Sequence, residues 1–145
     1  MITQELEDSL HKIFVGAYLD CVRLVTLERL LLGLLENEKV LAVLMSRFAD
    51  VADLRLLLGE HVEAEQPEVT FNEVLVSPSI AVQRVIERAY SQVQSGDKKR
   101  DVSSVDILFC IFFEAQSDAC TYLHQCNISK EDVAAFVMYG SSDST

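Results

Sequence analysis

Apolar residues recur at intervals of three and four along most of the chain, which is the spacing of one face of an α-helix. Two of the clearest stripes run over residues 6–17 and 82–93. The pattern predicts eight amphipathic helices, at residues 3–19, 27–36, 38–47, 51–62, 78–95, 104–114, 116–126 and 130–138. Residues 67–75 alternate only in part, and their proline and acidic residues favour a loop. We therefore expect an all-α fold without strands.

Residues of the types that commonly cap helices directly precede several of the predicted helices. A side-chain oxygen in this position can accept a hydrogen bond from an N–H of the first helical turn. The residues that directly precede a helical run are Thr26, Asp50, Ser77, Ser103 and Ser129. Pro78 is expected at the first helical position, where a backbone N–H would have no acceptor within the helix, so the lack of one in proline costs nothing.

The two halves of the chain match each other. The apolar pattern pairs residues 6–14 with 82–90, 25–35 with 102–112 after one inserted residue, and 50–54 with 129–133. Self-similarity of this kind indicates repeated structural units. It predicts a tandem pseudo-twofold repeat of two four-helix units.

The expected organisation is a single domain over residues 1–140. Repeat one takes residues 1–62, an acidic connector residues 63–77, and repeat two residues 78–140. The small polar residues 141–145 are typical of the start of a flexible linker.

Composition and charge narrow the class of partner. The chain has 145 residues, 50% of them hydrophobic, so it can bury a core without disulfides or metal. Its formal charge of -11 repels phosphate, which argues against nucleic acid and anionic membranes as partners. The apolar runs are too short for a membrane span, and the acidic start lacks a secretory signal. We expect a cytoplasmic location and a monomeric isolated domain.

The motifs of known chemistry are missing from the sequence. The five glycines do not have the spacing of a phosphate-binding loop, so no nucleotide cofactor is expected. His11, His61 and His124 lie far apart, and Cys120 with His124 is half a metal site at most. The four cysteines form no Cys-x-x-Cys pair and are expected to be buried free thiols. We expect no catalytic, cofactor or metal residues.

Residues 25–35 resemble a known signature. The stretch Val-Thr-Leu-Glu-Arg-Leu-Leu-Leu-Gly-Leu-Leu is similar to the T-x-E-H-L-L-L-A-L-L motif that opens the second helix in the amino-terminal domain of Clp ATPases. The segments that resemble the ClpA branch of that family are 4–7, 78–89, 93–96 and 132–140. The resemblance covers essentially the whole chain.

The resemblance implies a non-catalytic protein-recognition domain, joined flexibly to a double AAA+ ring that unfolds proteins for the ClpP peptidase. In ClpA-like proteins this domain docks the ClpS adaptor, which delivers substrates bearing N-degrons, and it contacts substrates. The family pattern would place the adaptor surface on Glu28, Ser79 and Arg84. Each also has an ordinary interpretation: Glu28 favourably opposes the helix dipole, and the other two are solvated positions.

Two departures from the family pattern concern this surface. Arg23 stands where close relatives carry an acid, which reverses one charge at the expected adaptor edge. Val22 and Arg29 stand where relatives carry histidines, so a metal site built on those histidines is not carried over.

Two other classes of function stay open on the sequence. One is a free-standing regulator of the same fold that competes for the adaptor or substrate. The other is a small helical enzyme of unknown type that uses the acidic connector, which the missing nucleophile, metal set and phosphate loop disfavour.

Overall fold

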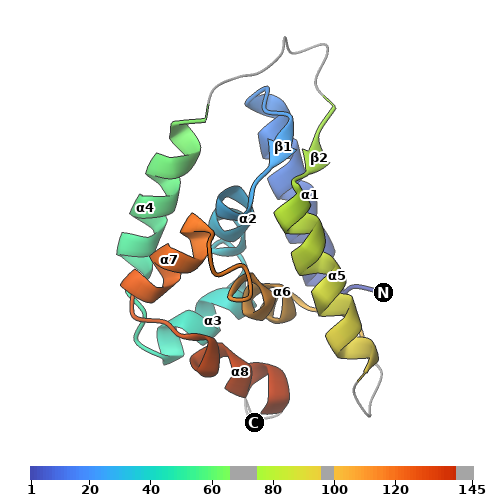
Figure 1. Cartoon of the computed structure of the whole chain (residues 1–145), viewed down its shortest axis with the longest axis vertical. Helices are drawn as coiled ribbons and strands as arrows, with labels where there is room; N and C mark the ends of the chain where they lie inside the picture. The colour runs from blue at the N-terminus through green and yellow to red at the C-terminus, as the bar shows by residue number, and fades with distance from the viewer. Residues whose placement is uncertain (66–74, 96–99, 140–145) are drawn as a thin grey trace.

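The computed structural model describes residues 1–65, 75–95 and 100–139, and within them the chain forms eight helices and two short strands (Figure 1). In order they are α1 (Gln4–Leu19), β1 (Leu24–Val25), α2 (Leu27–Leu34), α3 (Glu38–Ser46), α4 (Val51–Glu63), β2 (Ser77–Pro78), α5 (Ile80–Gln94), α6 (Ser104–Ile111), α7 (Asp118–Gln125) and α8 (Lys130–Tyr139). The predicted all-α class is confirmed. Most of the predicted connector and all of the predicted linker lie outside the described residues.

Helix α5 starts two residues later than the sequence pattern predicts. Ser79, not Ser77, caps it, with its side chain accepting a hydrogen bond from the N–H of Val82 at 3.2 Å. The N–H of Ser79 donates to the carbonyl of Val25 at 2.9 Å, which keeps the backbone extended through residue 79. Pro78 therefore lies in a strand, and its expected place in the first helical turn is wrong.

The other predicted caps that can be followed are confirmed. Thr26 accepts from the N–H of Arg29, and Asp50 accepts from that of Asp53. Ser103 begins α6 with a reciprocal capping box, in which Asp106 reaches back to the N–H of Ser103. The hydroxyl of Ser129 accepts a hydrogen bond from the N–H of Asp132 in the first turn of α8.

Two parallel pairings join the repeats, and the expectation of no strand is wrong for them. β1 precedes α2 and pairs with β2, which precedes α5. Ile2, just before α1, pairs with Val102, just before α6. Each pairing therefore brings together the segment before the first helix of one repeat and the segment before the second helix of the other.

Helix packing follows the same pseudo-twofold relation, with α1 to α4 equivalent to α5 to α8. Helix α1 packs on α2 as α5 packs on α6, and α2 packs on α4 as α6 packs on α8. The turns after α3 and α7 also match, because Phe48 and Asn127 both have positive φ, of 61° and 72°. The predicted tandem repeat is confirmed.

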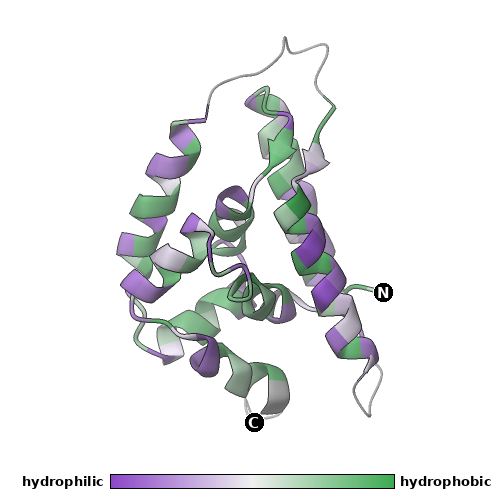
Figure 2. Ribbon diagram, viewed as in Figure 1, coloured by the Kyte–Doolittle hydropathy of each residue, from purple (hydrophilic) through white to green (hydrophobic). Residues whose placement is uncertain are grey.

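The core lies around α2 and α6. In Figure 2, α6 is mostly green, whereas α5 alternates between green and purple bands as a half-exposed helix does. Leu30, Leu31, Ile107 and Leu108 are at most 1% exposed. α1 and α2 approach so closely that a Cβ atom added at Gly33 would overlap the side chain of Ile13.

A polar network crosses this core. The carboxylate of Glu5 accepts hydrogen bonds from the N–H and the hydroxyl of Ser104, and from the side-chain amide of Asn37. Asn37 in turn caps α3, so the network ties α1, α3 and α6 together. Burial alone raises the pKa of Glu5, but the hydrogen bonds from Ser104, Thr3 and Asn37 outweigh it and lower the pKa.

Candidate functional site

The pairing of β1 with β2 brings two of the predicted docking residues to one edge of the molecule (Figure 1). The N–H of Ser77 donates to the carbonyl of Arg23 at 2.9 Å, and the N–H of Ser79 donates to that of Val25 at the same distance. The side chain of Arg23 is exposed. Arg23 and Ser79 thus flank the same pair of strands, with Arg23 beside Ser77 and Ser79 beside Val25. The hydroxyl of Ser79 is occupied as the cap of α5.

Arg84 lies farther along α5 and makes a two-pronged ion pair with Glu114. The guanidinium Nε and Nη2 are 3.2 and 2.7 Å from the two carboxylate oxygens. The hydrogen bond and charge of Glu114 raise the pKa of Arg84, and the hydrogen bond from Arg84 lowers that of Glu114. The Arg84 side chain is 53% exposed, whereas that of Glu114 is 11% exposed. The ion pair therefore fixes the orientation of the exposed Arg84 guanidinium.

A groove of about 610 Å³ runs beside this ion pair. One wall is α5, which contributes Ala81, Arg84 and Arg88, and the other is the segment 113–117 between α6 and α7. The guanidinium of Arg88 lies 4.8 Å from the centre of the Phe113 ring, in a cation–π contact. The groove is therefore lined by two guanidinium groups, one aromatic ring, the Glu114 carboxylate and small or polar side chains.

Exposed apolar side chains, which were not predicted from the sequence, surround the same edge. Leu24 is 44% exposed, Leu75 83% and Ile80 70%. The helical pattern contained a signal for Ile80, since this residue lies outside the buried stripe of α5, whose members are Val82, Val85, Ala89 and Val93.

Glu28 does not join this edge. It is only 8% exposed, and its Oε2 accepts a hydrogen bond from the N–H of Ala119 at 2.9 Å, in the first turn of α7. The Glu28 side chain is therefore buried at the contact between α2 and α7 and is not presented to a partner. The negative charge of Glu28 interacts favourably with the positive N-terminal ends of both the α2 and the α7 dipoles.

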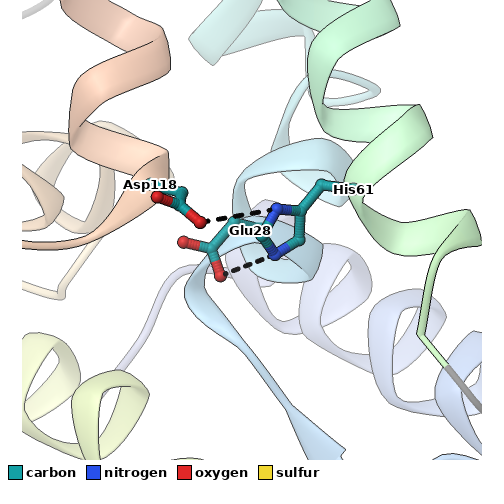
Figure 3. A group of neighbouring side chains, drawn as sticks. All are labelled: Glu28, His61 and Asp118. Atoms are coloured by element: carbon teal, nitrogen blue, oxygen red, sulfur yellow. Dashed lines mark ion pairs between the residues drawn. The ribbon is translucent and has the colours of Figure 1, made fainter.

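Glu28 instead lies in a cluster with His61 of α4 and Asp118 of α7 (Figure 3). Oε1 of Glu28 is 3.6 Å from Nε2 of His61, and Oδ2 of Asp118 is 3.7 Å from Nδ1. The hydroxyl of Tyr122 lies 3.3 Å from the same Nδ1. Sequence spacing gave no sign of this cluster, because each residue comes from a different helix.

The cysteines of the described residues are not arranged for nucleophilic chemistry. Burial, with a smaller contribution from a nearby aspartate, raises the pKa of Cys110 to about 12 and that of Cys126 to about 11. Cys120 is also buried, with a raised pKa, and its sulfur is 3.9 Å from Nδ1 of His124. Cys21 is half-buried, and all four thiols are free. A thiol with a raised pKa stays protonated and is a weak nucleophile.

None of the helices in the described ranges is both long and apolar enough to cross a bilayer.

Comparison with known proteins identifies relatives over nearly the full chain. A family model described as the Clp repeat N-terminal domain matches residues 1–126. A ClpA homolog protein of Fuscovulum blasticum is 30% identical in an alignment of 139 residues that covers 93% of this chain and 17% of the relative. The chain thus spans about a sixth of the length of that relative.

Two solved structures share the fold. The N-terminal domain of the ClpV1 ATPase from E. coli superposes with a TM-score of 0.77 at 15% identity, covering 97% of this chain and 86% of that one. A structure from a study of a malarial protein secretion system gives 0.76 at 13% identity, covering 95% and 92%. At these identities the likeness concerns the fold alone.

Proposed function

Because the chain belongs to the family of Clp N-terminal repeat domains, we propose that it is the protein-recognition domain of a ClpA-like AAA+ unfoldase. In this proposal the domain hydrolyses nothing itself. It captures a ClpS-type adaptor, or unfolded and degron-bearing substrates, in the cytoplasm, and the ATPase modules of the full-length protein pass those substrates to ClpP.

The observation that supports docking is the composition of one edge of the domain. We define the docking edge as Arg23, Leu24, Ser79, Ile80 and Arg84. It combines exposed apolar side chains with a cation that Glu114 holds in place. Protein interfaces commonly pair an apolar centre with arginine anchors at or near their middle.

The docking edge departs from the surface that the family pattern implies. The docking edge retains three predicted residues, Arg23, Ser79 and Arg84. Ser79 contributes by fixing the backbone geometry at the start of α5 and not by a direct contact of its hydroxyl. Glu28 is left out, because its carboxylate faces α7 and is nearly inaccessible. Glu28 would influence adaptor binding only indirectly, by helping to position the segment 113–117, which lines the groove.

Calorimetric titration of the domain with a ClpS-type adaptor from the same source tests the proposal. We expect Ile80→Ser and Arg84→Gln each to weaken binding by at least about tenfold, the scale of a residue central to an interface. Arg55→Gln is the matched control, because the Arg55 side chain is similarly exposed, at 46%. Its helix, α4, lies away from β1 and β2 in Figure 1.

The control variant should bind like the unmodified domain. Unchanged affinity in both edge variants would place the docking surface elsewhere, and no binding by the unmodified domain would contradict the adaptor assignment itself.

A further inference from the structure

We propose that Glu28, His61 and Asp118 form a binding site for a divalent transition-metal ion of the zinc type. One ligand atom from each residue lies within 4.8 Å of a ligand atom from each of the other two. Figure 3 shows the three side chains converging from α2, α4 and α7. The site is independent of the docking edge. It replaces our expectation, based on the spacing of cysteines and histidines along the chain, of no metal residues.

The distances between these groups suit metal ligands better than hydrogen bonds. The two carboxylate–imidazole separations are 3.6 and 3.7 Å, longer than a hydrogen bond between such atoms. Ligands at 2.0–2.1 Å in a tetrahedral zinc site stand about 3.3–3.4 Å from one another. The Glu28 contact is to Nε2 and the Asp118 contact is to Nδ1, and one ion binds only one ring nitrogen. An ion on Nε2 therefore needs Glu28 to close by a few tenths of an ångström, whereas Asp118 has to move by up to about 1.5 Å from its present distance of at most 4.8 Å.

The innermost ligand is already held in position. Oε2 of Glu28 accepts the hydrogen bond from Ala119, and this leaves Oε1 directed at the His61 ring. When Nε2 binds the ion beside Oε1 of Glu28, the other ring nitrogen, Nδ1, keeps the hydroxyl of Tyr122 as a polar neighbour at 3.3 Å. Outer contacts of this kind orient the ligands of natural metal sites.

Charge favours a cation at the same place. Two carboxylates face one imidazole, which carries at most a single positive charge. The Glu28 side chain is 11% exposed and that of His61 26% exposed, so solvent screens them only in part. Asp118 is 62% exposed and leaves an open approach for the ion. One imidazole and two carboxylates are ligands that zinc accepts, with a water molecule as the fourth.

Metal binding at this site would tie the two repeats together. Glu28 and His61 belong to the first four helices, and Asp118 belongs to the last four. An ion bound only by the folded arrangement stabilises that arrangement. We therefore expect zinc to raise the melting temperature of the domain.

The test is calorimetric titration of the metal-free 145-residue chain with zinc chloride at pH 7.5, together with thermal unfolding at several zinc concentrations. We expect one ion per chain and a melting temperature that rises with zinc. His61→Gln and Asp118→Asn should weaken binding by at least the roughly 10–100-fold that losing an outer contact of a metal ligand causes. They should also abolish the thermal shift. His124→Gln is the matched control, since it removes an exposed histidine that lies six residues after Asp118 on α7 and outside the cluster.

The cobalt-substituted chain separates this site from a thiol site. Cobalt bound by His61, Glu28 and Asp118 should show visible ligand-field bands without the near-ultraviolet charge-transfer band of a cobalt–thiolate bond. A thiolate band, unchanged affinity in His61→Gln, loss of binding in His124→Gln, or no saturable zinc binding by the unmodified chain would each overturn the proposal.

Discussion

Glu28 and Ala119 form a hydrogen bond across 91 positions of sequence, from the carboxylate of one to the backbone N–H of the other, at 2.9 Å. The contact is buried and joins the first turn of α2 to the first turn of α7. A residue that the family pattern assigns to partner binding therefore also holds the two repeats together.

The first prediction concerns the stability of this contact. Glu28→Ala should lower the free energy of unfolding by about 1–3 kcal/mol, because it leaves the buried N–H of Ala119 without an acceptor. Urea denaturation followed by circular dichroism measures the change. Glu28→Gln, which keeps an acceptor oxygen, should cost clearly less, and equal losses in both variants would show that the charge, not the hydrogen bond, matters.

A second prediction concerns the close approach of α1 and α2 at Gly33. Alanine forms helices better than glycine by about 1 kcal/mol, yet Gly33→Ala should destabilise the domain, because its Cβ would overlap the side chain of Ile13. Thermal unfolding of Gly33→Ala, Ile13→Ala and the double variant forms a mutant cycle. The double variant should be less destabilised than the sum of the two single changes, whereas additive effects would mean that Ile13 moves aside freely.

The pseudo-twofold fold could be predicted from the sequence because its signals are local. Apolar stripes and caps such as Thr26 and Ser103 depend on neighbours within one helical turn, and both repeats carry them. The segments before the helices were harder to interpret, since Ser77 and Ser79 are equally good caps by residue type. The choice between them follows from the pairing of Ser79 with Val25, a contact between distant segments.

The candidate site could be predicted only in part, for the same reason. Arg84 was identified through the family pattern, but its partner Glu114 lies 30 residues away. The burial of Glu28 depends on how α7 docks, and the approach of His61 and Asp118 depends on the packing of α4 and α7. No pattern along the chain reports such contacts.

A third prediction follows from the strained turn after α3. Phe48 has a φ of 61° and is 85% exposed, so it bears the steric cost of the left-handed region without burying its ring. Phe48→Asn should therefore raise the free energy of unfolding by about 1 kcal/mol, measured by urea denaturation. Asn127→Phe at the equivalent turn is the reciprocal variant and should lower it. A loss of stability in Phe48→Asn would indicate that the ring makes a stabilising contact.

A fourth prediction concerns the stability of the domain at low pH. The pKa of Glu5 is lowered by folding from its ordinary value of 4.5, so its ionised form stabilises the folded state above that value. That contribution should be lost as the pH falls from about 4.5 through the lower pKa of the folded state. Urea denaturation at a series of pH values should show a shallower acid decline for Glu5→Gln than for the unmodified chain. Asp8→Asn on the exposed face of α1 is the control, and an unchanged decline in Glu5→Gln would contradict the prediction.

The last prediction concerns the sign of the charge at Arg23. This residue lies on the docking edge, where its carbonyl pairs with the N–H of Ser77, and its side chain is exposed. If a ClpS-type adaptor presents a basic face to this edge, Arg23→Glu should tighten binding and raise the association rate about 3–10-fold at low salt. The gain should shrink as added salt screens the charges.

Stopped-flow association at two salt concentrations measures the Arg23 effect, with Arg55→Glu as the control for the change in net charge alone. Arg55→Glu should change the rate much less, because Arg55 lies on α4. Weaker binding by Arg23→Glu would instead identify an acidic residue of the adaptor that pairs with Arg23, and equal rates in all three proteins would remove Arg23 from the docking edge.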